Sequence, residues 1–124
     1  MDGGDLRLDL TLDEYCRTLS NYAQEMIQED REIRLKYDKD VPIYAVLYLM
    51  FRCGLIKEAV ELSEQHSGDA PKLGQLIQNF NETSGNIEEL YRSRAEQMLQ
   101  EANDPSKSDI FKEALLIILT NDHT

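Results

Sequence analysis

Residues 42–62 read PIYAVLYLMFRCGLIKEAVEL, and this stretch decides the fold. It begins with nine consecutive apolar residues, Ile43–Phe51, which are too few for a transmembrane helix, because crossing a bilayer needs about 20. A buried strand is the alternative, but alanine, leucine and methionine form helices well, and only two of these nine residues are β-branched. Pro42 suits the first turn of a helix, and Gly54 suits the left-handed position after a helix end. We therefore predict a helix over residues 42–53 that neighbouring helices cover on several faces.

The second half of the stretch predicts an ordinary amphipathic helix. Its apolar residues recur at steps of three and four, as one face of a helix requires: Leu55, Ile56, Ala59, Val60 and Leu62. A helix with one apolar face packs that face against a neighbour, so the two predicted helices form a hairpin. We expect this hairpin to be the centre of the core. Its expected structural residues are Tyr44, Leu47, Tyr48, Phe51, Cys53 and Gly54.

Composition and charge narrow the class of protein. A chain of 124 residues with 41% hydrophobic residues has the material for one packed domain. The net charge of −11 argues against binding to nucleic acid or to anionic membranes, which attract lysine and arginine. The amino terminus has no basic segment followed by an apolar one, so we infer no secretory signal. Cys16 and Cys53 lie in apolar helical stretches, which favours buried free thiols of a reducing compartment over a disulfide.

Four more helices are expected around the hairpin. The first begins at a capping box of Thr11 and Glu14 and continues to about Asp38, and residues 28–39 form a charge-dense end. This end is expected to be solvated, and a salt-bridged contact with a partner is the alternative. The other expected caps and ends are Asp40 before the helix at Pro42, His66 in the last turn of the next helix, Pro71 and Gly85 at the start and end of the fourth, Asn86 before the fifth, and Ser106 or Ser108 before the sixth.

The resulting fold class is all-α, because no segment alternates apolar and polar residues. The short connections between predicted helices make successive helices antiparallel neighbours, as in bundles and in stacked-helix solenoids. We expect a single α-helical domain over residues 1–124 with about six antiparallel stacked helices, in which residues 1–10 are frayed or disordered. This domain is expected to be a fragment of a longer α-solenoid.

The last predicted helix motivates the solenoid interpretation. It becomes apolar on every side at Leu115–Leu119, and no later helix follows it in the printed sequence. Either the fold wraps back over this helix, or the chain belongs to a longer solenoid; we favour the second. A face for a partner or for the next solenoid helix is then expected, formed by Ile110, Phe111, Leu115, Leu116, Ile118 and Leu119.

The residues that carry chemistry are sparse. His66 and His123 are the two histidines, and no C-x-x-C or H-x-x-x-H spacing suggests a zinc site. Cys53 and His66 as a catalytic pair are disfavoured, because they lie near opposite ends of the hairpin. We therefore expect no enzyme, no catalytic residue, no metal, no cofactor and no small-molecule substrate.

Residues 40–54, DVPIYAVLYLMFRCG, followed by Glu58-Ala59, resemble the nucleoporin-interacting component family, the inner-ring scaffold nucleoporins. In that family a proline-aromatic start leads through an aromatic-rich apolar helix to Arg-Cys-Gly or Arg-Ala-Gly. A second segment, with Asp104-Pro105, Lys107, the apolar run to Leu119 and Asn121-Asp122, is similar to the Asp-Pro-x-Lys helix of the family. The coiled segment through which the family recruits channel nucleoporins has no counterpart in this chain.

The resemblance implies a structural scaffold of the nuclear pore complex at the nuclear envelope, which supports nucleocytoplasmic transport of mRNA and protein. It implies other nucleoporins as partners, with no nucleic-acid binding and no insertion into the membrane. The alternative is a generic helical-repeat adaptor, tetratricopeptide-like or proteasome-lid-like. Residues 54–62, GLIKEAVEL, fit that alternative because a glycine turn before an alanine-containing helix is common in helix-pair repeats.

Overall fold

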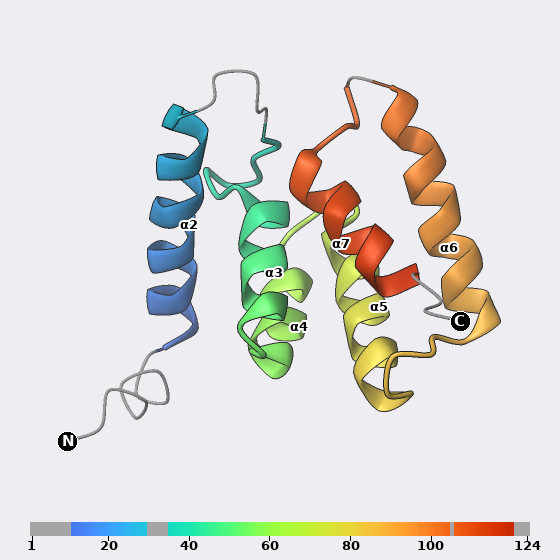
Figure 1. The fold of residues 1–124 in the computed structure, drawn as a ribbon. Coiled ribbons are helices and arrows are strands. Elements are labelled where there is room, and N and C mark those ends of the chain that lie inside the picture. The colour runs from blue at the N-terminus through green and yellow to red at the C-terminus, as the bar shows by residue number, and fades with distance from the viewer. Residues whose placement is uncertain (1–10, 30–34, 105, 121–124) are drawn as a thin grey trace.

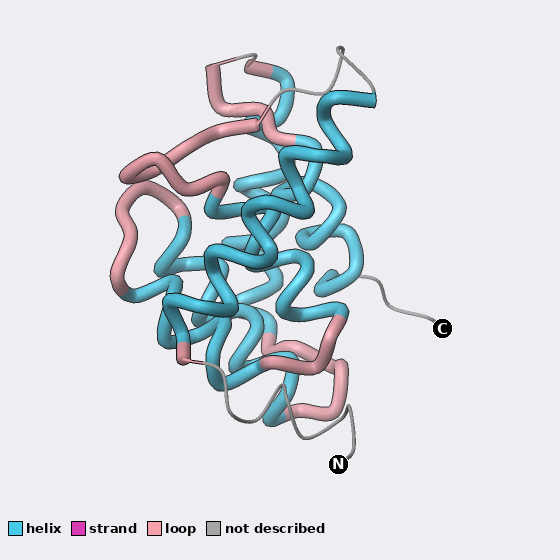
Figure 2. Tube along the Cα trace, turned by 90° about the vertical axis from the view of Figure 1, so that its left-hand side faces the viewer, coloured by secondary structure: helices cyan, strands magenta, loops and turns pink. Residues whose placement is uncertain are grey.

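The computed structural model describes residues 11–29, 35–104 and 106–120 of the chain, and the side chains within these ranges except those of 26–29. The expected frayed start, residues 1–10, and His123 lie outside the described residues. Regular structure in the described ranges is helical, which confirms the all-α class (Figures 1 and 2). The helices are α2 (Leu12–Glu29), α3 (Ile43–Arg52), α4 (Ile56–Glu64), α5 (Ala70–Glu82), α6 (Glu89–Gln100), a short 3-10 turn η1 (Glu101–Asn103) and α7 (Ile110–Thr120).

The helices pack in two layers. Figure 1 shows that successive helices alternate in direction, with α3 and α7 in front of α4 and α5. Helix α3 packs against α4, α5 and α7, and α4 packs closely along α5. The remaining two helices flank this group: α2 lies against α3, and α6 lies against α7. None of the described helices combines the length and the apolar character that crossing a membrane requires.

Helix α3 is the centre of the core, as its apolar sequence predicts. Its buried residues are Ile43, Tyr44, Ala45, Val46, Leu47 and Met50. Tyr48 and Phe51 are half-buried, and their rings pack against Phe111 and Phe80 at centroid distances of 5.5 and 5.4 Å. Coverage on several faces is therefore confirmed.

The expectation of a buried Cys53 is wrong. Helix α3 ends at Arg52, so Cys53 is the C-cap residue and is exposed, together with Gly54. Gly54 has a φ of +79°, as its predicted position after the helix end requires. The Leu55 N–H donates to the Met50 carbonyl at 2.8 Å and the Gly54 N–H to the Phe51 carbonyl at 3.1 Å. These two bonds form a Schellman motif, so Gly54 shapes the turn into α4 and does not pack in the core.

Local signals predict some helix ends correctly. The capping box is confirmed: the Glu14 N–H donates to Thr11 Oγ1 at 3.2 Å, and Glu14 Oε1 accepts from the Thr11 N–H at 3.1 Å. Pro71 lies in the first turn of α5, as predicted. After α5, the left-handed conformation begins one residue earlier than predicted. Ser84 has a φ of +56°, and Gly85 follows it.

Three other predicted caps are wrong, and at α6 and α7 other side chains make the hydrogen bonds instead. Helix α3 starts after Pro42 with no capping side chain, so Asp40 does not cap it. At α6, Asn79 of α5 replaces Asn86: its Oδ1 accepts from the Glu88 N–H at 2.9 Å. Asp109 caps α7 in place of Ser106 or Ser108, since its Oδ1 accepts from the Phe111 and Lys112 N–H groups.

The α4–α5 pair has an unusually close contact. A Cβ atom placed on Gly74 would lie 1.9 Å from Ser63 Oγ and 2.8 Å from Ser63 Cβ. Ser63 is fully buried, and its hydroxyl donates to the Val60 carbonyl at 2.6 Å. Position 74 therefore has room for a hydrogen atom alone, and glycine lets the two helices pack backbone against side chain.

Candidate functional site

The six residues predicted as a partner face on α7 do not form one face. Phe111, Leu115, Leu116 and Leu119 are buried, because α7 packs against α3, α5 and α6. The fold thus wraps back over this helix, which is the alternative that the sequence did not favour. The prediction of a partner face is wrong for these four residues.

A narrower apolar stripe remains on the outer side of α7. Ile110 and Ile117 are 50% and 56% exposed, and Ala114 and Ile118 beside them are half-buried. Spacings of four, three and one place these four residues on one side of the helix, and we call them the α7 outer stripe. The sequence did not single out Ile117, because the apolar run Leu115–Leu119 has no period that distinguishes an inner from an outer side.

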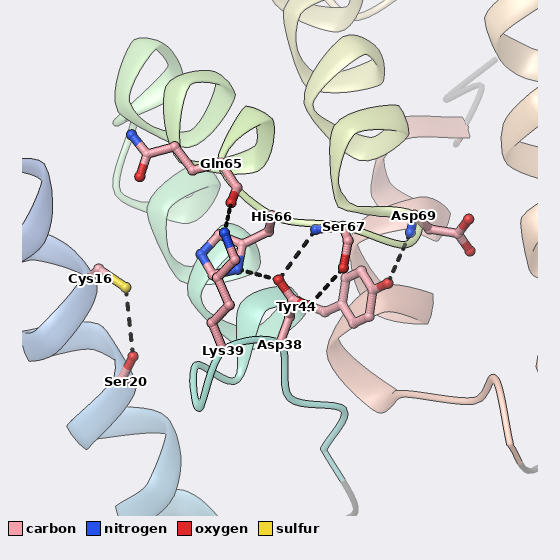
Figure 3. A network of polar contacts seen from close by, with 9 residues as sticks. All are labelled: Cys16, Ser20, Asp38, Lys39, Tyr44, Gln65, His66, Ser67 and Asp69. Carbon is pink, nitrogen blue, oxygen red and sulfur yellow. Dashed lines mark hydrogen bonds and ion pairs between the residues drawn. The ribbon is translucent and has the colours of Figure 1, made fainter.

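A polar network joins the segment before α3 to the α4–α5 turn (Figure 3). The Asp38 carboxylate lies 2.7 Å from His66 Nδ1 and accepts from the Ser67 hydroxyl at 2.7 Å and from the Ser67 N–H at 3.2 Å. Lys39 Nζ donates to the Gln65 carbonyl at 2.9 Å. His66 lies past the end of α4, not in its last turn as predicted, and its side chain is only 6% exposed. The network fixes the irregular residues 35–42 against the turn.

The geometry of this network differs from that of a nucleophile and base. The Ser67 hydroxyl donates to Asp38 and makes no hydrogen bond to His66, so the histidine is not placed to take its proton. Cys53 and His66 lie beyond opposite ends of α4, a helix of nine residues and therefore about 14 Å long. Within the described ranges, no three His, Cys, Asp or Glu side chains are placed to share a metal ion. The contacts of the network hold residues 38 and 39 against residues 65–67.

The Asp38 carboxylate makes part of the stability depend on pH. The Ser67 hydroxyl, then the His66 ring and the Ser67 N–H, hold the pKa of Asp38 below its ordinary value. A carboxyl pKa that is lower in the folded chain gives stability that is complete above the unfolded value of about 3.9 and is lost as the pH falls through the folded value. We expect Asp38→Asn to lower the urea midpoint at pH 7, and the difference from the unmodified chain to shrink below about pH 4.

Urea titrations at pH 7, 5, 4 and 3 measure this difference. The exposed neighbour Asp40, changed to asparagine, is the matched control, and it should shift the midpoint little at any of these pH values. A deficit of Asp38→Asn that stayed constant down to pH 3 would contradict the assignment.

A partly buried ion pair joins three helices next to the same turn. Lys112 Nζ of α7 lies 2.5 Å from Asp69 Oδ2, which precedes α5, and the two side chains are 5% and 22% exposed. The ammonium also lies 5.3 Å from the ring centroid of Tyr44 of α3, and the Tyr44 hydroxyl accepts from the Asp69 N–H at 3.3 Å.

Nearby, burial raises the pKa of the Asp109 carboxyl, although N–H groups including that of Lys36 favour its charged form. This cluster holds α7 against α3 and α5.

The two cysteines are free thiols. Cys16 is half-buried, and its burial raises the pKa of the thiol. Cys53 is exposed at the end of α3. The expectation of buried thiols is therefore wrong for Cys53 and only partly met by the half-buried Cys16.

An acidic groove runs along α4 and the end of α5. It has a volume of about 840 Å³ and is lined by Gly54, Ile56, Lys57, Glu58, Val60, Glu61, Glu64, Gln78, Asn81 and Glu82. Glu58, Glu61 and Glu64 recur every three residues, so they share one side of α4. The sequence contained this spacing, but the groove itself depends on how α5 packs beside α4.

Comparisons with known proteins give no assignment. No family model, no curated protein and no solved structure matches the chain.

Proposed function

We propose that this chain is a scaffold segment of the inner ring of the nuclear pore complex, which binds other nucleoporins through the surfaces of its stacked helices. The observation that carries the proposal is the resemblance of residues 40–54 to the inner-ring scaffold family. The structure gives these residues a central role: they form the helix α3 and the glycine turn that follows it. A motif at the centre of the core fits a structural protein, because it determines how the surrounding helices pack.

The surfaces of the molecule support a role in protein binding. The α7 outer stripe presents two isoleucines that are at least half exposed. Apolar side chains gathered on one helix face are typical of sites where another protein element packs. We propose that a helix of the scaffold or of a partner nucleoporin covers this stripe, and we propose no catalytic activity for the chain.

The second candidate is a generic helical-repeat adaptor outside the nuclear pore. It is favoured by the glycine turn at Gly54 and by the close α4–α5 contact at Gly74, because tight helix pairs are the unit of helical-repeat proteins.

Cellular location separates the two candidates. We expect a fluorescent tag on the gene that encodes this chain to give a punctate rim at the nuclear envelope. Ile110→Glu combined with Ile117→Glu should disperse that rim, because the charges prevent packing on the α7 outer stripe. Both side chains are exposed, so the unfolding free energy should change by less than about 1 kcal/mol.

The matched control is Leu90→Glu, which places a charge at a leucine of α6 that is 60% exposed and lies outside the stripe. This variant should keep the rim. Diffuse fluorescence of the unmodified protein would contradict the pore assignment and favour the adaptor. Leu116→Glu cannot test the stripe, because Leu116 is fully buried and its change would disturb the core.

A further inference from the structure

We propose that the acidic groove between α4 and α5 binds a short basic segment of a partner protein, with lysines or arginines on both sides of a small apolar residue. The inference rests on the proposed role in protein binding and adds the chemistry of the partner. It concerns a surface separate from the α7 outer stripe, since none of the residues that line the groove belongs to α7.

The charge of the groove is strongly unbalanced. Glu58, Glu61 and Glu64 of α4 and Glu82 of α5 face one cation, Lys57, which leaves a net charge of −3 on the lining. Among the described residues, none of these four carboxylates forms an ion pair, and Glu82 accepts only a long hydrogen bond of 3.4 Å from Gln78. The described residues therefore leave the carboxylates of the groove unpaired, and a basic partner would meet a net negative surface.

The shape of the groove suits a peptide. Ile56 and Val60 are half-buried in its lining and offer an apolar surface among the carboxylates. Gly54, at one end of the lining, is exposed. From Ile56 to Glu64 the lining follows about 12 Å of helix at the helical rise, which an extended peptide of about four residues covers.

Charge complementarity selects this occupant over others. Nucleic acid carries the same sign of charge as the groove, so it is repelled. A second copy of the chain has a net charge of −11 and would bring more carboxylates to the same place. A basic segment supplies the missing cations, and its small apolar residue can pack on Val60.

Fluorescence anisotropy tests the proposal. The probe is a fluorescein-labelled heptapeptide that carries two arginines and two lysines around a central valine. We expect saturable binding that weakens with added salt. The variant Glu58→Gln, Glu61→Gln, Glu64→Gln should weaken binding at least about fivefold, because three pairings are lost. Asn81→Arg, which places a cation in the groove, should weaken it as well.

The matched control removes the same amount of charge elsewhere. Glu25→Gln, Glu89→Gln, Glu96→Gln neutralises three exposed glutamates of α2 and α6, so both triple variants have a net charge of −8. This control should weaken binding less than about twofold. Equal weakening by both triple variants would mean non-specific attraction and would overturn the proposal.

Light scattering tests the competing occupant. A dimer of the unmodified chain that the groove variant dissociates would show that a second copy fills the groove, and this too would overturn the proposal. Failure of the peptide test leaves the nuclear-rim experiment unaffected, because that experiment uses residues of α7 and α6.

Discussion

Leu47→Ala is expected to lower the free energy of unfolding by about 2–5 kcal/mol. Leu47 is fully buried in the middle of α3, where neighbouring helices surround it. Removing three carbon atoms there loses their burial and leaves a cavity that these helices cannot fill without moving. Urea denaturation followed by circular dichroism measures the change.

The control for this prediction is Leu90→Ala. Leu90 is 60% exposed on α6, so its truncation should cost less than about 0.5 kcal/mol. A loss of under 1 kcal/mol for Leu47→Ala would mean that α3 is not central to the core.

Asp69→Asn is expected to destabilise the fold by about 3 kcal/mol. The change leaves the Lys112 ammonium, which is 5% exposed, without its carboxylate partner in a poorly hydrated place. This loss of stability is at the lower end of the range for breaking a buried ion pair, because the Asp109 carboxylate also interacts with Lys112. Loss of a helix cap does not contribute, since the Asp69 side chain makes no capping hydrogen bond to α5.

Two variants isolate the buried charge as the cause. Adding Lys112→Met to Asp69→Asn removes the orphaned charge, so the double variant should be more stable than Asp69→Asn alone. Glu101→Gln breaks the exposed pair with Lys107, whose atoms are 3.5 Å apart, and should cost less than about 1 kcal/mol. If the double variant were the least stable of the three, the ion-pair explanation would be wrong.

Local sequence signals predicted the parts of the fold that depend on local physics. The capping box at Thr11, the helix from Ile43 and the left-handed Gly54 all follow from residues within one or two helical turns of each other. The predicted helix end near Asp38 is wrong, because residues 35–38 are not helical; residues 30–34 lie outside the described residues. Around Asp38, contacts with residues distant in the sequence determine the structure. The Asp38 carboxylate contacts His66 of the α4–α5 turn, and the Lys36 N–H donates to Asp109 at 2.7 Å.

The candidate surfaces were less predictable, because they depend on which neighbour each helix face meets. The run Leu115–Leu119 is apolar on every side, so its pattern could not tell that α3, α5 and α6 would cover most of it. The pairing of Lys112 with Asp69 joins residues 43 positions apart, and no local pattern marks it. The glutamates of the acidic groove were visible at a spacing of three, but an acidic helix face alone is indistinguishable from a solvated one.

The contact between Gly74 and Ser63 has a consequence for how the α4–α5 pair tolerates change. The distance between these helices is limited by atoms close to the backbone and not by long side chains that can rotate. Such a contact has few ways to repack, so it fixes the distance between α4 and α5, which pack closely along each other. Substitutions among the outward glutamates can then alter what the molecule attracts while the spacing that receives it stays constant.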